Sequence, residues 1–86
     1  MASYSILLTK SAAKELERVP TKDRQRIATR IGSLAENPRP IGVEKLSGDD
    51  KYRSRQGNYR ILYEIIDTDL IVTVVRIGDR REVYRR

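Results

Sequence analysis

The residues of this chain that are best able to do chemistry are arginines and one tyrosine. Residues 77–86, IGDRREVYRR, place Tyr84 among four arginines. Arginine presents a planar fork that holds two phosphate oxygens at once. A tyrosine has a pKa of about 10, and neighbouring arginines lower that pKa because they favour the phenolate. RNA supplies its own nucleophile, the 2′-hydroxyl, so Arg80, Arg81 and Tyr84 are candidates for holding and activating a scissile phosphate.

A plainer interpretation of Tyr84 stays open, since an aromatic residue this close to the end could simply pack on the edge of the domain. The charge of the chain nevertheless favours a polyanionic partner. The formal net charge is +6, and residues 51–86 carry eight Arg and one Lys against five acidic residues. Such clustering of arginine is typical of surfaces that bind phosphate.

A second group of arginines is predicted on one face of a sheet. Gly57-Asn58 favours a two-residue hairpin turn, which places Arg55 opposite Arg60. A three-residue loop at 67–69 would then place Arg60 opposite Arg76. The face that results carries the candidate phosphate-binding residues Arg53, Arg55, Arg60 and Arg76.

Like charges directly opposite each other on a sheet cost up to about 1 kcal/mol per pair. A sequence selected for stability alone would avoid this arrangement, so we interpret the face as a preformed anion site. The alternative is that the arginines extend into water and pair with Glu64 or Glu82.

Several classes of protein are not expected. The chain has no cysteine and no histidine, so neither a disulfide nor a transition-metal site is predicted, and no phosphate-loop motif suggests a cofactor. No apolar run approaches the length of a membrane span, and the N-terminus lacks the pattern of a secretion signal. We therefore expect a cytoplasmic protein with a single domain over residues 1–86.

The elements that must position these residues follow from hydrophobic periodicity. Residues 1–36 read as a strand and two amphipathic helices, the first capped by Ser11 and the second by Thr21. From residue 51 the period changes to two, which is typical of strands. The predicted strands are 4–9, 51–56, 58–66 and 70–77, the helices 12–19 and 21–35, and the loop 37–50. The predicted fold is α+β, with a helical hairpin packed on one face of a four-stranded sheet.

The stretch KLSGDDKYRSRQGNYRILYEI, followed by a strand and IGDRREVYRR, resembles the RelE branch of the RelE/ParE toxin superfamily. TKSAAKELERVP and the NPRP turn match as well. The resemblance implies a type II toxin that cuts messenger RNA in the ribosomal A site by 2′-hydroxyl attack, with a RelB-like antitoxin, the ribosome and mRNA as partners. It also implies that Arg60 grips the phosphate, that Arg80 stabilises the transition state and that Tyr84 acts as base or orients the nucleophile, with Arg53 and Arg55 beside them.

The chain departs from the RelE pattern at three positions. Arg53 and Arg55 stand where the pattern has lysines, and Asp79 stands where many relatives have histidine. Arginine is a poor proton donor at neutral pH, so the general acid has no assigned residue. Two alternatives also stay open: a ParE-like inhibitor of DNA gyrase without nuclease activity, and a ribosome- or RNA-binding domain that does not cut. Retention of Arg80 and Tyr84 favours the nuclease.

Overall fold

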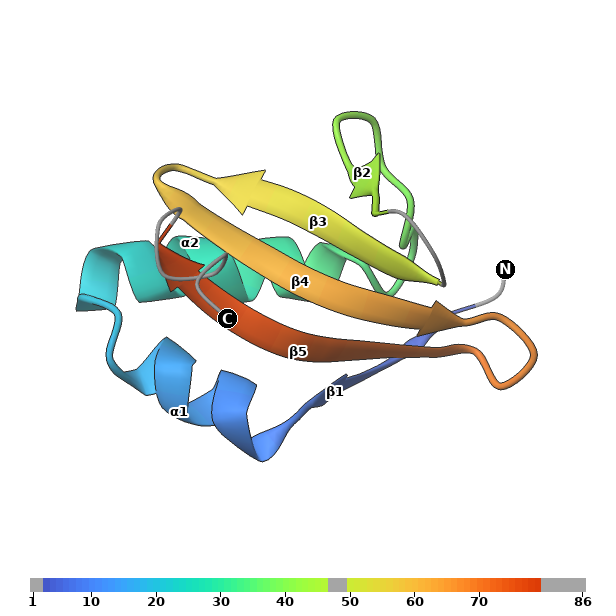
Figure 1. Cartoon of the computed structure of the whole chain (residues 1–86), viewed down its shortest axis with the longest axis horizontal. Helices are drawn as coiled ribbons and strands as arrows, with labels where there is room; N and C mark the ends of the chain where they lie inside the picture. The colour runs from blue at the N-terminus through green and yellow to red at the C-terminus, as the bar shows by residue number, and fades with distance from the viewer. Residues whose placement is uncertain (1–2, 47–49, 80–86) are drawn as a thin grey trace.

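The computed structural model describes residues 3–46 and 50–79. Over these residues two helices pack against a five-stranded sheet with the strand order β1-β5-β4-β3-β2. Figure 1 shows α2 crossing behind the sheet and α1 beside β5. The elements are β1 (Ser5–Leu8), α1 (Lys10–Glu17), α2 (Thr21–Ser33), β2 (Glu44–Lys45), β3 (Lys51–Gln56), β4 (Tyr59–Ile66) and β5 (Ile71–Asp79). The predicted α+β fold is confirmed, with one strand more than expected.

The additional strand is β2, which falls inside the segment that was predicted to be a loop. Glu44 pairs with Arg53 and Lys45 with Tyr52, so β2 is a two-residue edge strand beside β3. A strand this short carries no alternation that periodicity could detect. It matters because it brings the side chain of Glu44 to the arginine face.

The first helix begins earlier than its sequence suggested. Thr9, not Ser11, is the N-cap, and its Oγ1 accepts a hydrogen bond from the N–H of Ala12 at 3.1 Å. The prediction of Ser11 was wrong because both residues are good caps and only the end of β1 distinguishes them. The second helix begins at the predicted Thr21, but its cap position is Pro20, which makes no side-chain capping bond.

The core lies between the helices and the face of the sheet that they cover. Of the predicted core-facing residues of β3 and β4, all are buried except Tyr59, which is partly buried; Ile61, Tyr63 and Ile65 are inaccessible to water. They pack with Ile27 and Leu34 from the second helical segment, as the helical spacing indicated. Since side chains alternate along a strand, the residues between them point to the opposite, open face.

The β3–β4 hairpin has the predicted register. Arg55 pairs with Arg60, Arg53 with Leu62, and Gln56 with Tyr59 across the turn at Gly57. Gly57 has a φ of 62°, a conformation that glycine adopts without strain. Arg53, Arg55 and Arg60 therefore share the open face.

The β4–β5 register differs from the prediction. The turn has four residues, 67–70, and an irregularity at Leu62/Tyr63 shifts the pairing further, so Arg60 lies opposite Gly78 and Arg76 opposite Leu62. The predicted pairing of Arg60 with Arg76 was wrong. The turn ends with Leu70 at a φ of 54°, which a leucine rarely adopts, so no residue preference could have revealed it.

β5 is paired on both sides over its first half only. β1 runs parallel to it from Ser5 opposite Ile71 to Leu8 opposite Val74, and the chain then turns into α1. Beyond this point the edge of β5 faces α1. There a side chain of the helix supplies the acceptor, because Oε1 of Glu15 accepts the N–H of Ile77 at 2.8 Å. No helix within the described residues is long and apolar enough to cross a membrane.

Candidate nucleic-acid interface

The centre of the candidate site is the pair Arg55 and Arg60 on the open face of the hairpin. They are direct cross-strand partners, and Arg53 lies two residues before Arg55 on the same face. The exposure of the three side chains differs greatly, because 59% of Arg55 and 21% of Arg53 is accessible, whereas Arg60 as a whole residue is 9% exposed. The face thus places the mostly buried Arg60 beside two arginines that are more accessible to water.

Arg60 makes few hydrogen bonds within the described residues. Among the described residues its Nε is buried and has no hydrogen-bond partner, and its Nη1 reaches the carbonyl of Tyr59 only at 3.4 Å. Its cross-strand neighbour Gly78 has no side chain to compete for the space. Burying a guanidinium with an unused donor is costly unless a ligand completes it. The unused donor makes Arg60 a candidate for binding an anion.

A carboxylate already lies at the rim of this face. Glu44 accepts a hydrogen bond from Nε of Arg53 at 2.8 Å and also contacts its Nη2. The same carboxylate oxygen lies 3.8 Å from Nη2 of Arg55. The hydrogen bond from Arg53, followed by the charges of Arg53, Arg55 and Arg60, lowers the pKa of Glu44. Glu44 is therefore an anion at neutral pH, and it was not among the predicted site residues.

Arg76 has a different environment from the one its sequence position suggested. Its Nε donates to Oε2 of Glu15 at 3.0 Å, and the same carboxylate accepts the N–H of Ile77 through its other oxygen. Both charged side chains are about three-quarters buried. This contact ties β5 to α1, and it gives Arg76 a structural partner away from Arg60. The other predicted residues, Arg80, Arg81 and Tyr84, lie outside the described residues.

A polar network fastens the opposite end of the sheet. Arg39 donates to both oxygens of Asp67, at 3.2 and 2.8 Å, and its Nε donates to the hydroxyl of Tyr52 at 3.0 Å. The hydroxyl of Tyr4 donates to the same carboxylate at 2.7 Å. The hydrogen bonds from Arg39 and Tyr4 lower the pKa of Asp67. Apart from the NPRP turn that contains Arg39, no sequence pattern predicts this network.

A buried tyrosine, Tyr63, holds the NPRP turn from the core side. The hydroxyl of Tyr63 donates to the carbonyl of Pro38 at 2.7 Å, and its ring stacks on Tyr52 with 5.8 Å between centroids. Burial raises the pKa of Tyr63 to about 12. Tyr63 therefore stays protonated and works as a donor throughout the physiological range.

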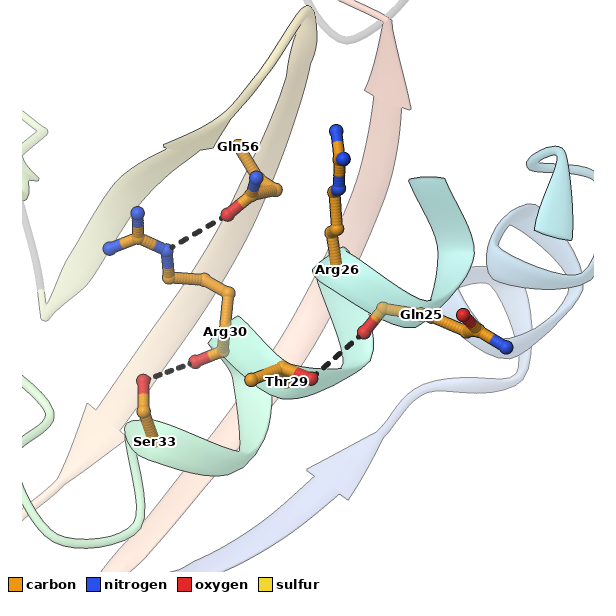
Figure 2. A pocket seen from close by; sticks show the side chains of 6 residues that line it. All are labelled: Gln25, Arg26, Thr29, Arg30, Ser33 and Gln56. Atoms are coloured by element: carbon orange, nitrogen blue, oxygen red, sulfur yellow. Dashed lines mark hydrogen bonds between the residues drawn. The ribbon is translucent and has the colours of Figure 1, made fainter. Parts of the chain in front are cut away.

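An open groove of about 550 Å³ lies on the helical side of the molecule. Figure 2 shows Arg30 reaching from α2 towards Gln56 at the end of β3, with 3.4 Å between Nε and Oε1. Thr29 and Ser33 direct their hydroxyls to carbonyls of their own helix. The groove has no candidate nucleophile or acid–base pair, and it belongs to the layer opposite the face that carries Arg60.

Comparison with known proteins finds similarity to type II toxins over nearly the whole chain. Residues 6–84 match the family described as ParE toxin of type II toxin-antitoxin system, parDE. Toxin RelG of Mycobacterium tuberculosis is 29% identical over 96% of this chain and 98% of its own length. The mRNA interferase toxin RelE of Escherichia coli is 30% identical, over 95% and 90% respectively. A crystal structure of an archaeal RelE–RelB complex from Pyrococcus horikoshii superposes with a TM-score of 0.82 at 28% identity, covering 91% of this chain and 96% of that one.

Proposed function

The chain belongs to the RelE/ParE superfamily of type II toxins as a RelE-like member, and on that premise we propose that it is a ribosome-dependent endoribonuclease that cuts messenger RNA in the A site. The observation that supports a nuclease most directly is the buried side chain of Arg60, with its unused Nε, directly opposite Arg55 and on the same face of the sheet as Arg53. The name of the E. coli relative, an mRNA interferase, supports the same activity.

In the proposed reaction the arginine face binds the scissile phosphate and the RNA supplies the nucleophile. The 2′-oxygen forms a bond to phosphorus, the bond from phosphorus to the 5′-oxygen breaks, and a 2′,3′-cyclic phosphate and a 5′-hydroxyl result. Arg60 holds the phosphate, and Arg53 and Arg55 add positive charge where negative charge develops. The protein thus contributes mainly position and electrostatics.

Proton transfer in this proposal falls to the end of the chain. Tyr84, as phenolate, takes the proton of the 2′-hydroxyl, while Arg80 lowers the pKa of Tyr84 and stabilises the transition state. The leaving 5′-oxygen takes its proton from water, since arginine is too weak an acid to supply it. A site without a strong acid is slow by itself, which fits an enzyme that needs the ribosome to place its substrate.

The proposed partners are a translating ribosome with its mRNA and a RelB-like antitoxin. Solved complexes of RelE with RelB, including the archaeal one, support the antitoxin. We propose that it is a segment that folds on binding and covers the helical hairpin and an edge of the sheet. The proposed place of action is the cytoplasm, where translation occurs.

Primer extension on a defined mRNA in a reconstituted bacterial translation mixture tests this proposal. We expect cuts at A-site codons when ribosomes are present and intact mRNA when they are withheld. Mass spectrometry of the fragments should find the cyclic phosphate or its opened 3′-phosphate. Intact mRNA at protein levels that arrest growth would contradict the proposal, and inhibition of purified DNA gyrase would then identify the ParE-like alternative.

A further inference from the structure

We propose that Glu44 is an internal competitor for the phosphate site, occupying the cationic rim of the open face until an RNA phosphate displaces it. This inference rests on the proposed function, because it assigns the phosphate site to Arg53, Arg55 and Arg60. It adds a residue that sets how tightly that site holds RNA.

The position of Glu44 follows from the short strand β2. Glu44 is the direct cross-strand partner of Arg53, so the two side chains lie on the same face of the sheet. Arg53 in turn is on the face that carries Arg55 and Arg60. One carboxylate therefore reaches two of the three arginines, with Nε of Arg53 at 2.8 Å and Nη2 of Arg55 at 3.8 Å.

The contacts of Glu44 are those that a phosphate would make. A carboxylate and a phosphodiester both present two anionic oxygens to a guanidinium fork. The lowered pKa of Glu44 keeps the carboxylate ionised at neutral pH, so it competes as an anion and cannot donate a proton. Its third cationic neighbour, Arg60, contributes to that lowering by charge alone, and its buried Nε is left unfilled.

The exposure of the pair makes displacement feasible. About half of the Glu44 side chain is accessible to water, against 21% of that of Arg53, its hydrogen-bonded partner, and 59% of that of Arg55. The contact with the exposed Arg55 contributes little to stability, and the Glu44 end of the contact with Arg53 is half open to water, so a ligand with more charge and better geometry can replace the carboxylate. RNA in solution meets a face on which Glu44 neutralises one of the three positive charges, so it binds weakly. RNA that the ribosome already holds against this face can displace the carboxylate.

The test is the affinity of the intact protein for a short single-stranded RNA with methylated 2′-hydroxyls, which cannot be cut by 2′-oxygen attack. Fluorescence anisotropy would be measured over a range of salt concentrations for the wild type, Glu44→Gln and Glu64→Gln. Glu64 is the matched control, because it is also a partly exposed glutamate on the open face but pairs with Lys51 at 3.9 Å. Both variants add the same net charge to the protein.

We expect Glu44→Gln to bind about three- to tenfold more tightly than Glu64→Gln at low salt, as removal of an exposed ion-pair partner allows. The slope of log affinity against log salt should steepen by roughly 0.7 relative to the control, since the carboxylate no longer competes with the phosphate for the arginines. Glu44→Asp keeps the charge but shortens its reach, and should lie between the wild type and Glu44→Gln. Circular dichroism should show the same fold for all four proteins.

Equal affinities for Glu44→Gln and Glu64→Gln would overturn the inference, and so would weaker binding by Glu44→Gln, which would make Glu44 an organiser of Arg53. Ribosome-dependent cleavage is a separate measurement. If Glu44→Gln binds more tightly but the wild type cuts no mRNA, the competitor role stands and the proposed nuclease falls. If the wild type cuts mRNA but the two variants bind alike, only the competitor role falls.

Discussion

Arg55 and Arg60 lie directly opposite each other across the β3–β4 hairpin, on the face of the sheet that neither of the two described helices covers. Two like charges in this position repel each other and weaken the hairpin. Arg60 adds the cost of a buried and unused donor. Costs of this kind are found where function, not stability, selects the residue.

Replacement of Arg60 by methionine should therefore separate function from stability. We expect Arg60→Met to raise the free energy of unfolding by about 1 kcal/mol, because a side chain of similar length without charge fills the same space. The affinity for ribosomes at moderate salt should fall. Urea denaturation and a ribosome sedimentation assay measure the two effects. Arg26→Met, on the exposed helical groove of Figure 2, is the matched control and should change neither strongly. Unchanged ribosome binding by Arg60→Met would contradict the arginine-face proposal.

Replacement of Tyr84 by phenylalanine tests the proposed base. Since the hydroxyl acts only in proton transfer, Tyr84→Phe should slow A-site cleavage by about 10²-fold or more and leave ribosome affinity nearly intact. Single-turnover cleavage and sedimentation of the same preparation give the two values. Equal loss of both would indicate that Tyr84 packs on the edge of the domain and takes no part in the chemistry.

The buried hydroxyl of Tyr63 should make stability sensitive to high pH. Its pKa is raised to about 12, so between pH 10 and 12 the unfolded chain loses this proton while the folded protein keeps it. Stability contributed by the group is complete below pH 10 and declines as pH rises towards 12. Tyr63→Phe should cost about 1–3 kcal/mol at neutral pH, because the Pro38 carbonyl loses its donor, and should flatten the alkaline decline. Equally steep alkaline curves for both proteins would exclude Tyr63 as the cause.

Asp67 should act in the opposite direction, at acid pH. Arg39 and Tyr4 lower its pKa below the ordinary value of 3.8, so the folded protein keeps this carboxylate ionised after the unfolded chain has bound a proton. Its contribution is complete above pH 3.8 and is lost as pH falls through the folded pKa. Asp67→Asn should therefore weaken the acid dependence of thermal unfolding. Asp69→Asn in the same turn is the control, and an identical effect of both changes would rule out the Arg39 network as the origin.

The carboxylate of Glu15 offers a test of Arg76. Glu15→Gln weakens the contact with Arg76 and should lower the free energy of unfolding by about 1–2 kcal/mol, with ribosome affinity unchanged. Glu17→Gln on the exposed side of the same helix should be neutral. If Glu15→Gln instead altered ribosome affinity at unchanged stability, Arg76 would return to the set of RNA-binding residues.

The success of prediction from the sequence depended on how local each feature is. Gly57-Asn58 determines a two-residue turn, so the pairing of Arg55 with Arg60 was correct in full. The register of β5 depends on a four-residue turn with Leu70 in a left-handed conformation and on an irregularity in the middle of the strand. Neither has a sequence signal, so the position of Arg76 was wrong by two residues.

Two glutamates make contacts between distant elements that the sequence could not place. Glu44 meets Arg53 through a strand of two residues, and Glu15 meets Ile77 through the packing of a helix on a strand edge. Each is an ordinary surface glutamate by composition. Only the folded arrangement shows that Glu44 faces the arginines and that Glu15 accepts a backbone N–H at the edge of β5.

The parallel pairing of β1 with β5 has a consequence for the ribosome that synthesises this protein. Ser5–Leu8 emerge early, yet their partners Ile71–Val74 are made after the whole of β3 and β4. β5 also separates β1 from β4, so until it is made the β3–β4 hairpin has no neighbour on that side, and hairpins alone are marginally stable. A nascent chain thus carries Arg53, Arg55 and Arg60 before it can present them, and its own translation is complete through β5 before the arginine face exists.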